Sequence, residues 1–232
     1  MYRTSSSVVL LAVLVVVALT IGLSSSAAAR GPAHLRAFAL WVQPDLDFNR
    51  PGEEQDLTAD ADGALGLGLS GEYQFSERLG LELGVFRASP DINLVNYLRE
   101  LDLTARTSDG QAMTPVSLGL NIHLLPEDRL DLYLAPFVAY VYYGDLEFHI
   151  DETFEIDGQT VTLQDSIRVD VDNDLAYGAT LGLDIPFSSQ PWAIATSLRY
   201  LATSLDITDP DGDRETLGFD SWIVSLGLSY SF

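Results

Sequence analysis

The stretch that decides the fold is FDSWIVSLGLSYSF, residues 219–232. Its side chains alternate with a period of two, which is the periodicity of a β-strand. One series is large and apolar: Trp222, Val224, Leu226, Leu228, Tyr230 and Phe232. The other series is mostly small and polar: Ser221, Ile223, Ser225, Gly227, Ser229 and Ser231. An apolar face against lipid and a small face inside a closed barrel account for both series.

The same alternation recurs in seven earlier stretches. They span residues 35–42, 63–75, 79–86, 113–124, 130–143, 174–186 and 192–205. The connections between the eight strands alternate between long and short, as they do in outer-membrane barrels. We therefore predict an all-β fold, a closed eight-stranded antiparallel transmembrane β-barrel with short periplasmic turns and long extracellular loops.

The four long connections differ in sequence character. Residues 43–62 and 207–218 are polar and predict loops. Residues 92–103 carry apolar side chains at mixed spacing, which predicts a short helix at the barrel rim. Residues 144–173 are acidic, and β-branched or aromatic residues flank an Asp157–Gly158 pair there. That pattern predicts a hairpin that protrudes beyond the membrane.

Outward-facing aromatic residues support the membrane interpretation. With short turns in the periplasm, one group falls at the periplasmic edge: Tyr73, Phe75, Trp192, Tyr230 and Phe232. A second group falls at the other edge: Tyr140, Tyr142, Tyr177 and Trp222. Two such girdles are typical of membrane barrels. The competing interpretation is a soluble lipocalin-like barrel, but a face of Gly, Ala and Ser is too small to build its dry core.

The N-terminus and the composition set the compartment and exclude some partners. Residues 1–29 combine Arg3, an apolar run and an A-x-A-like end, which predicts a cleaved signal peptide followed by the barrel in residues 30–232. An uncleaved anchor is the alternative. The formal net charge of -22 argues against nucleic acid as a partner. We expect no cofactor, and a location in the outer membrane of a Gram-negative-type bacterium, among lipid and lipopolysaccharide.

The inward-facing residues sort by height in the predicted lumen. The periplasmic half is polar and predicts a plug: Glu72, Glu82, Asn121, His123, Asp131, Asp184 and Arg199. Arg199 is expected to be the only cation of the lumen. The extracellular half is apolar and predicts a ligand site: Trp41, Phe86, Met113, Phe137, Val141, Leu201 and Ile223. An apolar ligand pocket and a plain packed core both fit this half.

Four stretches resemble the OmpW family of small outer-membrane barrels. They are residues 64–86, 114–140, 175–207 and 220–232, with the blocks SLRYL, DI and W…SLG…Y-F. The acidic segment 144–173 departs from the family. The resemblance implies uptake of small hydrophobic molecules through an apolar extracellular-side lumen, with lateral release into the membrane. It also implies that the terminal Phe232 is read by the barrel-assembly machinery.

Three further hypotheses follow from single features. Pro136 lies in mid-strand and cannot donate to the ladder, so it marks either a weak seam for lateral exit or a harmless kink.

Catalysis is not expected, because none of His34, His123 and His149 has an inward Ser and an acid at its height near the outer leaflet. Asp-rich loops could bind divalent cations but are more simply solvated, so no metal site is predicted. A structural or adhesive barrel without transport is the alternative function.

Overall fold

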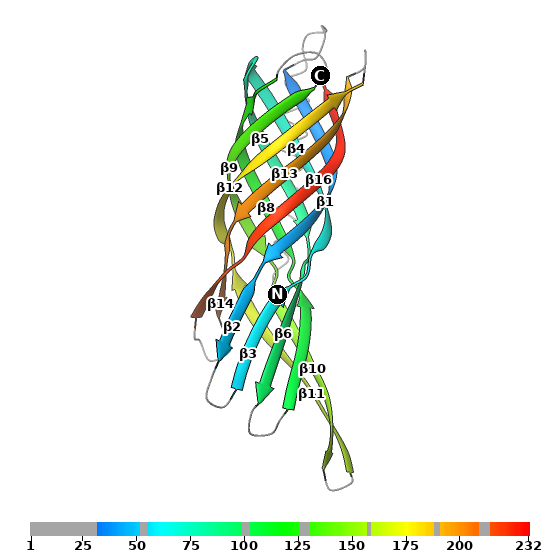
Figure 1. The fold of residues 1–232 in the computed structure, drawn as a ribbon, viewed down its shortest axis with the longest axis vertical. Helices are drawn as coiled ribbons and strands as arrows, with labels where there is room; N and C mark the ends of the chain where they lie inside the picture. Colours follow the sequence, from blue (N-terminus) through cyan, green and yellow to red (C-terminus); the bar gives the residue numbers. More distant parts are fainter. Residues whose placement is uncertain are drawn as a thin grey trace.

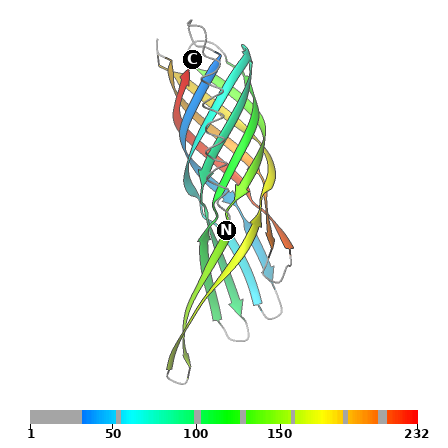
Figure 2. The same cartoon turned by 180° about the vertical axis from the view of Figure 1, so that it is seen from behind.

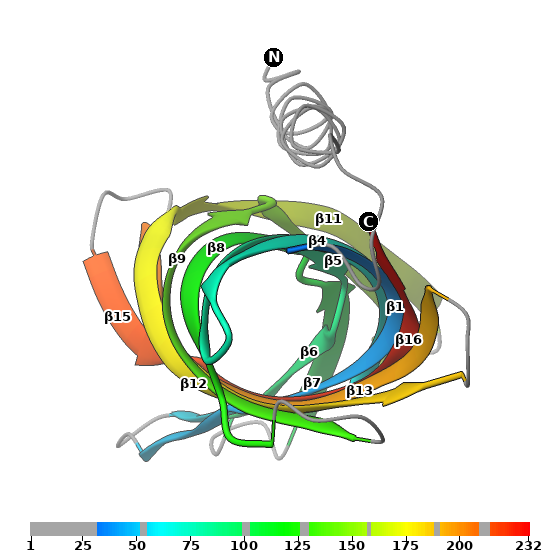
Figure 3. The same ribbon diagram turned by 90° about the horizontal axis from the view of Figure 1, so that it is seen from above.

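The structure is a computed structural model that describes residues 32–51, 55–98, 103–125, 130–156, 159–187, 191–208 and 214–232. These residues form strands and no helix, and so no helix among them could cross a membrane. Eight strands close into an antiparallel barrel in the order β1-β16-β13-β12-β9-β8-β5-β4 (Figures 1 and 3). Their bounds are β1 (Ala33–Asp45), β4 (Ala64–Ser76), β5 (Leu79–Ala88), β8 (Met113–His123), β9 (Asp131–Tyr143), β12 (Asp174–Pro186), β13 (Trp192–Ala202) and β16 (Asp220–Ser231).

The eight barrel strands are the eight that the alternation predicts, so the predicted fold class is confirmed. The barrel closes where the last strand meets the first. There the register between β1 and β16 runs without interruption from the His34–Ser231 pair to the Asp45–Asp220 pair. On its other side β16 pairs with β13. The predicted signal peptide, residues 1–29, lies outside the described residues and stays a prediction.

The long connections continue the barrel wall beyond the membrane. They form β2 (Asp47–Pro51), β3 (Gln55–Ala61), β6 (Asp91–Leu98), β7 (Leu103–Gly110), β10 (Leu146–Ile156), β11 (Gln159–Asp172), β14 (Ser204–Thr208) and β15 (Arg214–Gly218). Two sheets result, β2-β3-β6-β7 and β10-β11-β14-β15, and β7 contacts β10. These strands project from the end opposite to the C-terminus (Figures 1 and 2).

Three expectations about these connections were tested. The hairpin around residues 157–158 is confirmed, because Ile156 pairs with Gln159. The helix over residues 92–103 is wrong, because residues 92–98 lie in β6 and Leu103 begins β7. The predicted loops 43–62 and 207–218 also contain strands. The physical reason is that each barrel strand leaves backbone donors and acceptors at its end. A neighbouring strand that continues the ladder satisfies them whatever the local propensity.

The outer face of the barrel is apolar. Leu65, Leu67 and Leu175 are among its most exposed side chains, at 76%, 73% and 71%. Aromatic rings pair at both ends of this face: Trp192–Tyr230 and Tyr230–Phe232 at the periplasmic end, and Tyr140–Tyr142 and Tyr200–Trp222 at the extracellular end. The two predicted girdles are therefore present.

The prediction that Trp41 faces the lumen is wrong. Trp41 is 44% exposed on the outer face, whereas its neighbours Leu40 and Val42 are buried inside. Both series of β1 are apolar, so hydrophobicity alone does not decide which one faces lipid. Arg36 decides it, because it shares the period-two phase of Leu40 and Val42, and a cation on the lipid face destabilises a barrel. Trp41 instead joins the aromatic residues of the extracellular edge.

Candidate functional site in the barrel lumen

A buried ion-pair network closes the periplasmic half of the lumen. Arg36 of β1 lies at its centre. Its Nη1 is 2.8 Å from Glu72 Oε2 and 3.0 Å from Glu82 Oε2, and its Nη2 is 2.9 Å from Asp184 Oδ2. The three carboxylates come from β4, β5 and β12. One guanidinium therefore ties four of the eight strands together across the barrel.

His123 extends this network toward the periplasm. Its Nδ1 lies 2.8 Å from Asp131 Oδ1, and its Nε2 lies 2.7 Å from Glu72 Oε1. The ring of Tyr133 packs between His123 and Arg36, with centroid distances of 5.7 Å to the histidine ring and 5.0 Å to the guanidinium carbon. Tyr133 fits because Gly182 leaves room, since a Cβ there would lie 2.0 Å from its ring. Buried charges are tolerated when they are paired in this way.

The structure brings together all seven residues of the predicted polar plug. Asn121 donates to Glu82 Oε2 at 3.3 Å, and Arg199 Nη2 lies 3.6 Å from Glu82 Oε1. The expectation that Arg199 is the only lumen cation is wrong, because Arg36 is more deeply buried and makes the shorter pairs. We call the seven residues together with Arg36 and Tyr133 the polar floor. The sequence does contain a sign that Arg36 faces the lumen. Arg36 lies in the same period-two series of β1 as Leu40 and Val42, which are buried inside the barrel.

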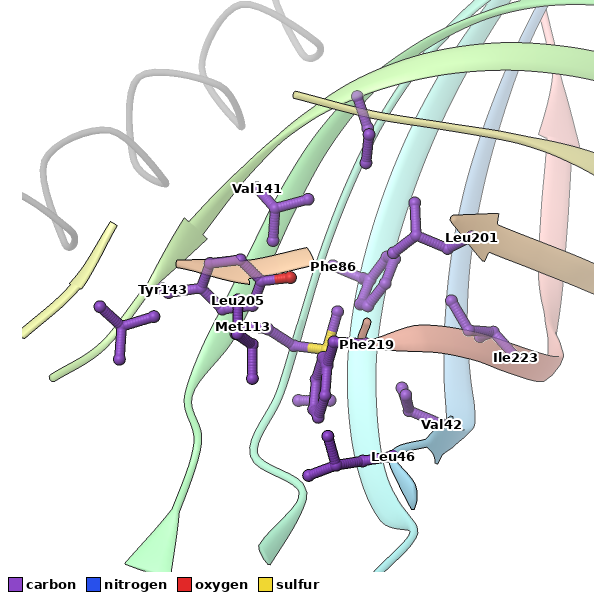
Figure 4. Packing of buried hydrophobic residues seen from close by; sticks show 14 of the residues in the cluster. Val42, Leu46, Phe86, Met113, Val141, Tyr143, Leu201, Leu205, Phe219 and Ile223 are labelled. Atoms are coloured by element: carbon purple, nitrogen blue, oxygen red, sulfur yellow. The ribbon is translucent and has the colours of Figure 1, made fainter. Parts of the chain in front are cut away.

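An apolar cluster fills the extracellular half of the lumen. Six of the seven residues predicted for the ligand site belong to it: Phe86, Met113, Phe137, Val141, Leu201 and Ile223. All six are buried. Further members, which were not predicted, come from the strands and their connections: Leu40, Val42, Leu46, Leu146, Leu205 and Phe219. Figure 4 shows labelled members of the cluster, among them Val42, Phe86 and Phe219, converging from several strands on one volume.

Little free space separates the polar floor from the apolar cluster. A cavity of about 20 Å³ lies between them, with Arg36, Arg199, Phe38, Phe86 and Ile223 among its lining residues. That volume is close to what one water molecule needs. Among the residues that the structure describes, the lumen at this level is packed, which is one of the two arrangements that the sequence left open.

A larger hollow lies on the lipid-facing side of the same wall. This groove has a volume of about 610 Å³ and crosses β16, β1, β4 and β5. Phe38 and Phe86 line both the groove and the small cavity of the lumen. Gly68 pairs with both phenylalanines, and a Cβ there would lie 2.3 Å from the Phe38 ring. The barrel wall is therefore thin at this place.

The strand ladders around β8 are interrupted at two prolines. Between β8 and β9 the register passes from Gly119–Phe137 to Ile122–Leu134 and omits the pairs at Pro136. Between β5 and β8 it passes from Val85–Val116 to Ala88–Met113 and omits the pairs at Pro115. The register is the same on both sides of each gap, so neither proline forms a bulge. Missing backbone donors explain both interruptions.

Two of the three histidines, His34 and His123, lie at the periplasmic end of the lumen. His34 Nδ1 lies 3.0 Å from Ser231 Oγ at the periplasmic end, but its Nε2 has no hydrogen-bond partner among the described residues. An acid that would orient this imidazole is thus missing from the pair. Within the described ranges no three His, Asp or Glu side chains are placed to hold a metal ion. Most of the acidic loop 209–215 lies outside those ranges.

Solved structures of outer-membrane barrels share this fold. OprG from Pseudomonas aeruginosa is 16% identical with a TM-score of 0.56, over 88% of this chain and 97% of that one. AlkL is 18% identical with a TM-score of 0.50, over 90% and 94%. The outer membrane protease OmpT from Escherichia coli is 9% identical with a TM-score of 0.51, over 90% and 100%. These identities are low, so the likeness concerns the fold alone.

A search of curated proteins finds no match. The family described as outer membrane protein beta-barrel domain matches residues 15–232, which is most of the chain. The closed eight-stranded barrel with its apolar outer face agrees with that match. The protein is thus placed in the outer membrane of a Gram-negative-type bacterium. The chain belongs to the outer membrane protein β-barrel domain family.

Proposed function

We propose that this barrel takes up small hydrophobic molecules from outside and releases them sideways into the membrane. The observation that carries the proposal is the division of the lumen into a sealed polar floor and an apolar cluster beside a thin wall. A hydrophobic molecule gains nothing from contact with buried charges. In the apolar cluster it can take the place of one side chain and make apolar contacts with the others. The resemblance to the OmpW family points to the same function.

The floor directs such a molecule away from the periplasm. To pass it, the molecule would have to separate Arg36 from three carboxylates, and each separated charge would stay buried without a partner. The apolar cluster is held mainly by packing between apolar side chains, so most of its side chains can change rotamer at much lower cost. Uptake therefore requires the cluster to rearrange, because the existing cavity of about 20 Å³ is too small for an organic molecule.

Two seams are candidates for the lateral exit. One lies between β1 and β4, where Phe38 and Phe86 separate the lumen from the lipid-facing groove. The other lies between β8 and β9, where Pro136 interrupts the ladder. We favour the first seam, because the lipid-facing groove already adjoins the barrel wall there. Gly68 has no side chain, so the Phe38 ring next to it is the barrier between the lumen and the groove. The sequence pointed only to the second.

Cysteine pairs across each seam separate these routes. The chain has no cysteine, so an introduced pair forms the only disulfide. Ala39→Cys with Leu67→Cys would lock β1 to β4, and Leu118→Cys with Val138→Cys would lock β8 to β9, since both pairs lie directly opposite in register. Uptake of a hydrophobic fluorescent probe into cells is measured before and after reduction.

We expect the oxidised β1–β4 pair to reduce uptake about tenfold and reduction to restore it, while the β8–β9 pair has little effect. The reverse result would assign the exit to the Pro136 seam, and so would a loss of uptake in Pro136→Val. Full uptake with both pairs oxidised would contradict lateral release.

The alternative is a structural or adhesive barrel without transport. The packed lumen favours it, because a cavity of about 20 Å³ is what a stable plugged barrel has. Under this alternative the unmodified protein gives no probe uptake above cells that lack it. The same measurement therefore decides between the two functions.

We also infer that the C-terminal residue is the contact for the barrel-assembly machinery. Phe232 follows the last strand, and its backbone N–H donates to Ala33 O at 2.9 Å, so it lies where the barrel closes. Phe232→Ala should reduce the amount of assembled barrel in the outer membrane. Unchanged assembly would show that the terminal aromatic residue is not recognised.

A further inference from the structure

We propose that the lipid-facing groove across β16, β1, β4 and β5 binds an acyl chain of an anionic outer-leaflet lipid, with Arg87 holding the anionic headgroup. The inference does not rest on transport, because the groove would hold its lipid in a barrel that takes up nothing. Its support comes from the groove's shape, its direction across the membrane and the single cation at its rim.

Small side chains make the hollow. On the outer face of β1, Ala37 and Ala39 line the groove. Their ladder neighbours are much taller, because Ala39 pairs with Leu67 on one side and Ala37 pairs with Leu228 on the other. A volume of about 610 Å³ lies within the range of small-molecule sites. An acyl chain meets only apolar side chains and backbone along this path.

The groove runs obliquely from the extracellular to the periplasmic side of the barrel. Arg87 is one residue from the extracellular end of β5, and Leu228 is three residues from the periplasmic end of β16. Both line the groove. A lipid of the outer leaflet has its headgroup at the extracellular surface and its chains directed inward, so it would enter this groove headgroup last.

Arg87 is placed to recognise a negative headgroup. It is exposed on the outer face, whereas the other two arginines of the described barrel strands, Arg36 and Arg199, face the lumen. It forms no ion pair with any residue that the structure describes. A cation on the lipid face is tolerated near the interface and is stabilised by an anionic partner. Arginine is also the side chain that binds phosphate with two parallel hydrogen bonds.

Charge argues against a second copy of the chain as the occupant. A twofold contact centred on the groove would bring the same surface of each copy together, and with it the two Arg87 side chains. The two outward cations would then repel each other inside a low-dielectric layer. An anionic lipid neutralises the same cation.

Quenching of Trp41 by brominated lipids tests the proposal. Trp41 lies two residues beyond Ala39 on the outer face of β1, so it reports on the groove. Trp192→Phe and Trp222→Phe leave it as the only tryptophan. The protein is folded into phosphatidylcholine vesicles that contain a minority of brominated phosphatidylglycerol or brominated phosphatidylcholine. We expect the anionic lipid to associate about fivefold more strongly near Trp41.

Two variants and one reporter control complete the design. Arg87→Gln should abolish the preference for phosphatidylglycerol, and Ala37→Leu should weaken quenching by both lipids because it fills the groove. The matched reporter is Tyr140→Trp on β9, on the opposite side of the barrel and 43% exposed against 44% for Trp41, in a chain without other tryptophans. The Tyr140→Trp reporter should show no preference for phosphatidylglycerol, whether residue 87 is Arg or Gln.

Three outcomes would overturn the proposal. A preference that survives Arg87→Gln would show that Arg87 does not hold the headgroup. Equal preference at Trp41 and at the β9 reporter would show general attraction of the lipid to the barrel. Quenching at Trp41 that falls as the protein density in the vesicle rises would show that a second copy covers the groove.

Discussion

The polar floor and the apolar cluster fill the same barrel in opposite ways. In the floor, charged groups from β1, β4, β5 and β12 meet at 2.8 to 3.1 Å around Arg36. In the cluster, apolar side chains from the barrel strands and from the strands beyond them pack against one another, and the Tyr143 hydroxyl, 2.9 Å from Thr203 Oγ1, lies at its edge (Figure 4). The arrangement of the polar floor is set by which charged groups pair with each other. The arrangement of the apolar cluster is set by how its side chains fill the available space.

The difference shows which half can open. A buried ion pair resists separation, because each partner would keep its desolvation penalty without its compensation. A packed apolar region resists substitution of its members but tolerates an apolar molecule that replaces lost contacts. An apolar molecule can thus enter the extracellular half while the periplasmic half stays closed. The predictions below test this contrast from the largest expected effect to the smallest.

The largest effect is expected for Arg36→Met. It leaves Glu72, Glu82 and Asp184 buried without their cation, so the free energy of unfolding should fall by about 3–5 kcal/mol. Urea titration in vesicles, followed by tryptophan fluorescence, measures it. The defect should shrink as pH falls, because protonated carboxyl groups no longer repel each other.

Arg199→Met is the matched control for that prediction. Its pair with Glu82 is longer, at 3.6 Å, and Arg199 also donates to a neutral oxygen, Thr180 Oγ1, at 3.0 Å. The loss should therefore be smaller. Equal losses for the two arginines would contradict the central position assigned to Arg36.

An intermediate effect is expected for Leu201→Ala in the apolar cluster. Leu201 is fully buried, so the truncation leaves a cavity and should lower the free energy of unfolding by about 2–5 kcal/mol. Benzene should restore part of the loss, because apolar cavities bind apolar molecules. Leu198→Ala, on the lipid face of the same strand, should lose less and should not respond to benzene. If benzene did not restore any stability to Leu201→Ala, the apolar cluster would be unable to admit an apolar ligand.

The smallest effect is expected for His123→Leu in the floor. It removes the contacts with Glu72 and Asp131 but leaves Arg36 in place, so the expected loss is about 1–3 kcal/mol. The comparison is His34→Leu, because His34 is also buried but its ring bonds only to Ser231 among the residues that the structure describes. If His34→Leu lowered the free energy of unfolding more than His123→Leu, the contacts of His123 with Glu72 and Asp131 would add little stability.

The sequence allowed much of the lumen to be predicted, because period two places every second side chain inside. The seven residues of the predicted plug and six of the seven predicted apolar residues all face inward. Trp41 was assigned to the wrong face because both series of β1 are apolar. Arg36 was missed for the same reason, although its charge marks the inward phase. Where one series is polar, as in β16, the pattern alone decided the face.

The strands beyond the membrane were predicted less well. Residues 92–103 carry no clear alternation, so local sequence suggested a helix. Pairing with β3 and β7 makes residues 92–98 a strand. Leu46 and Phe219 likewise lie at strand junctions, and they join the apolar cluster because the wall continues above the barrel. Such contacts depend on segments far apart in the chain, which a local pattern does not report.

The sequence by itself determined the barrel, its strand number, its orientation and the polarity of its two lumen halves. These properties follow from side-chain periodicity and from the lengths of the connections, which are local. Only the tertiary structure decided that Arg36 joins four strands, that the described part of the lumen is packed, and that a groove adjoins it at Phe38 and Phe86. The physical reason is that pair distances and free volume depend on the register and closure of all eight strands together.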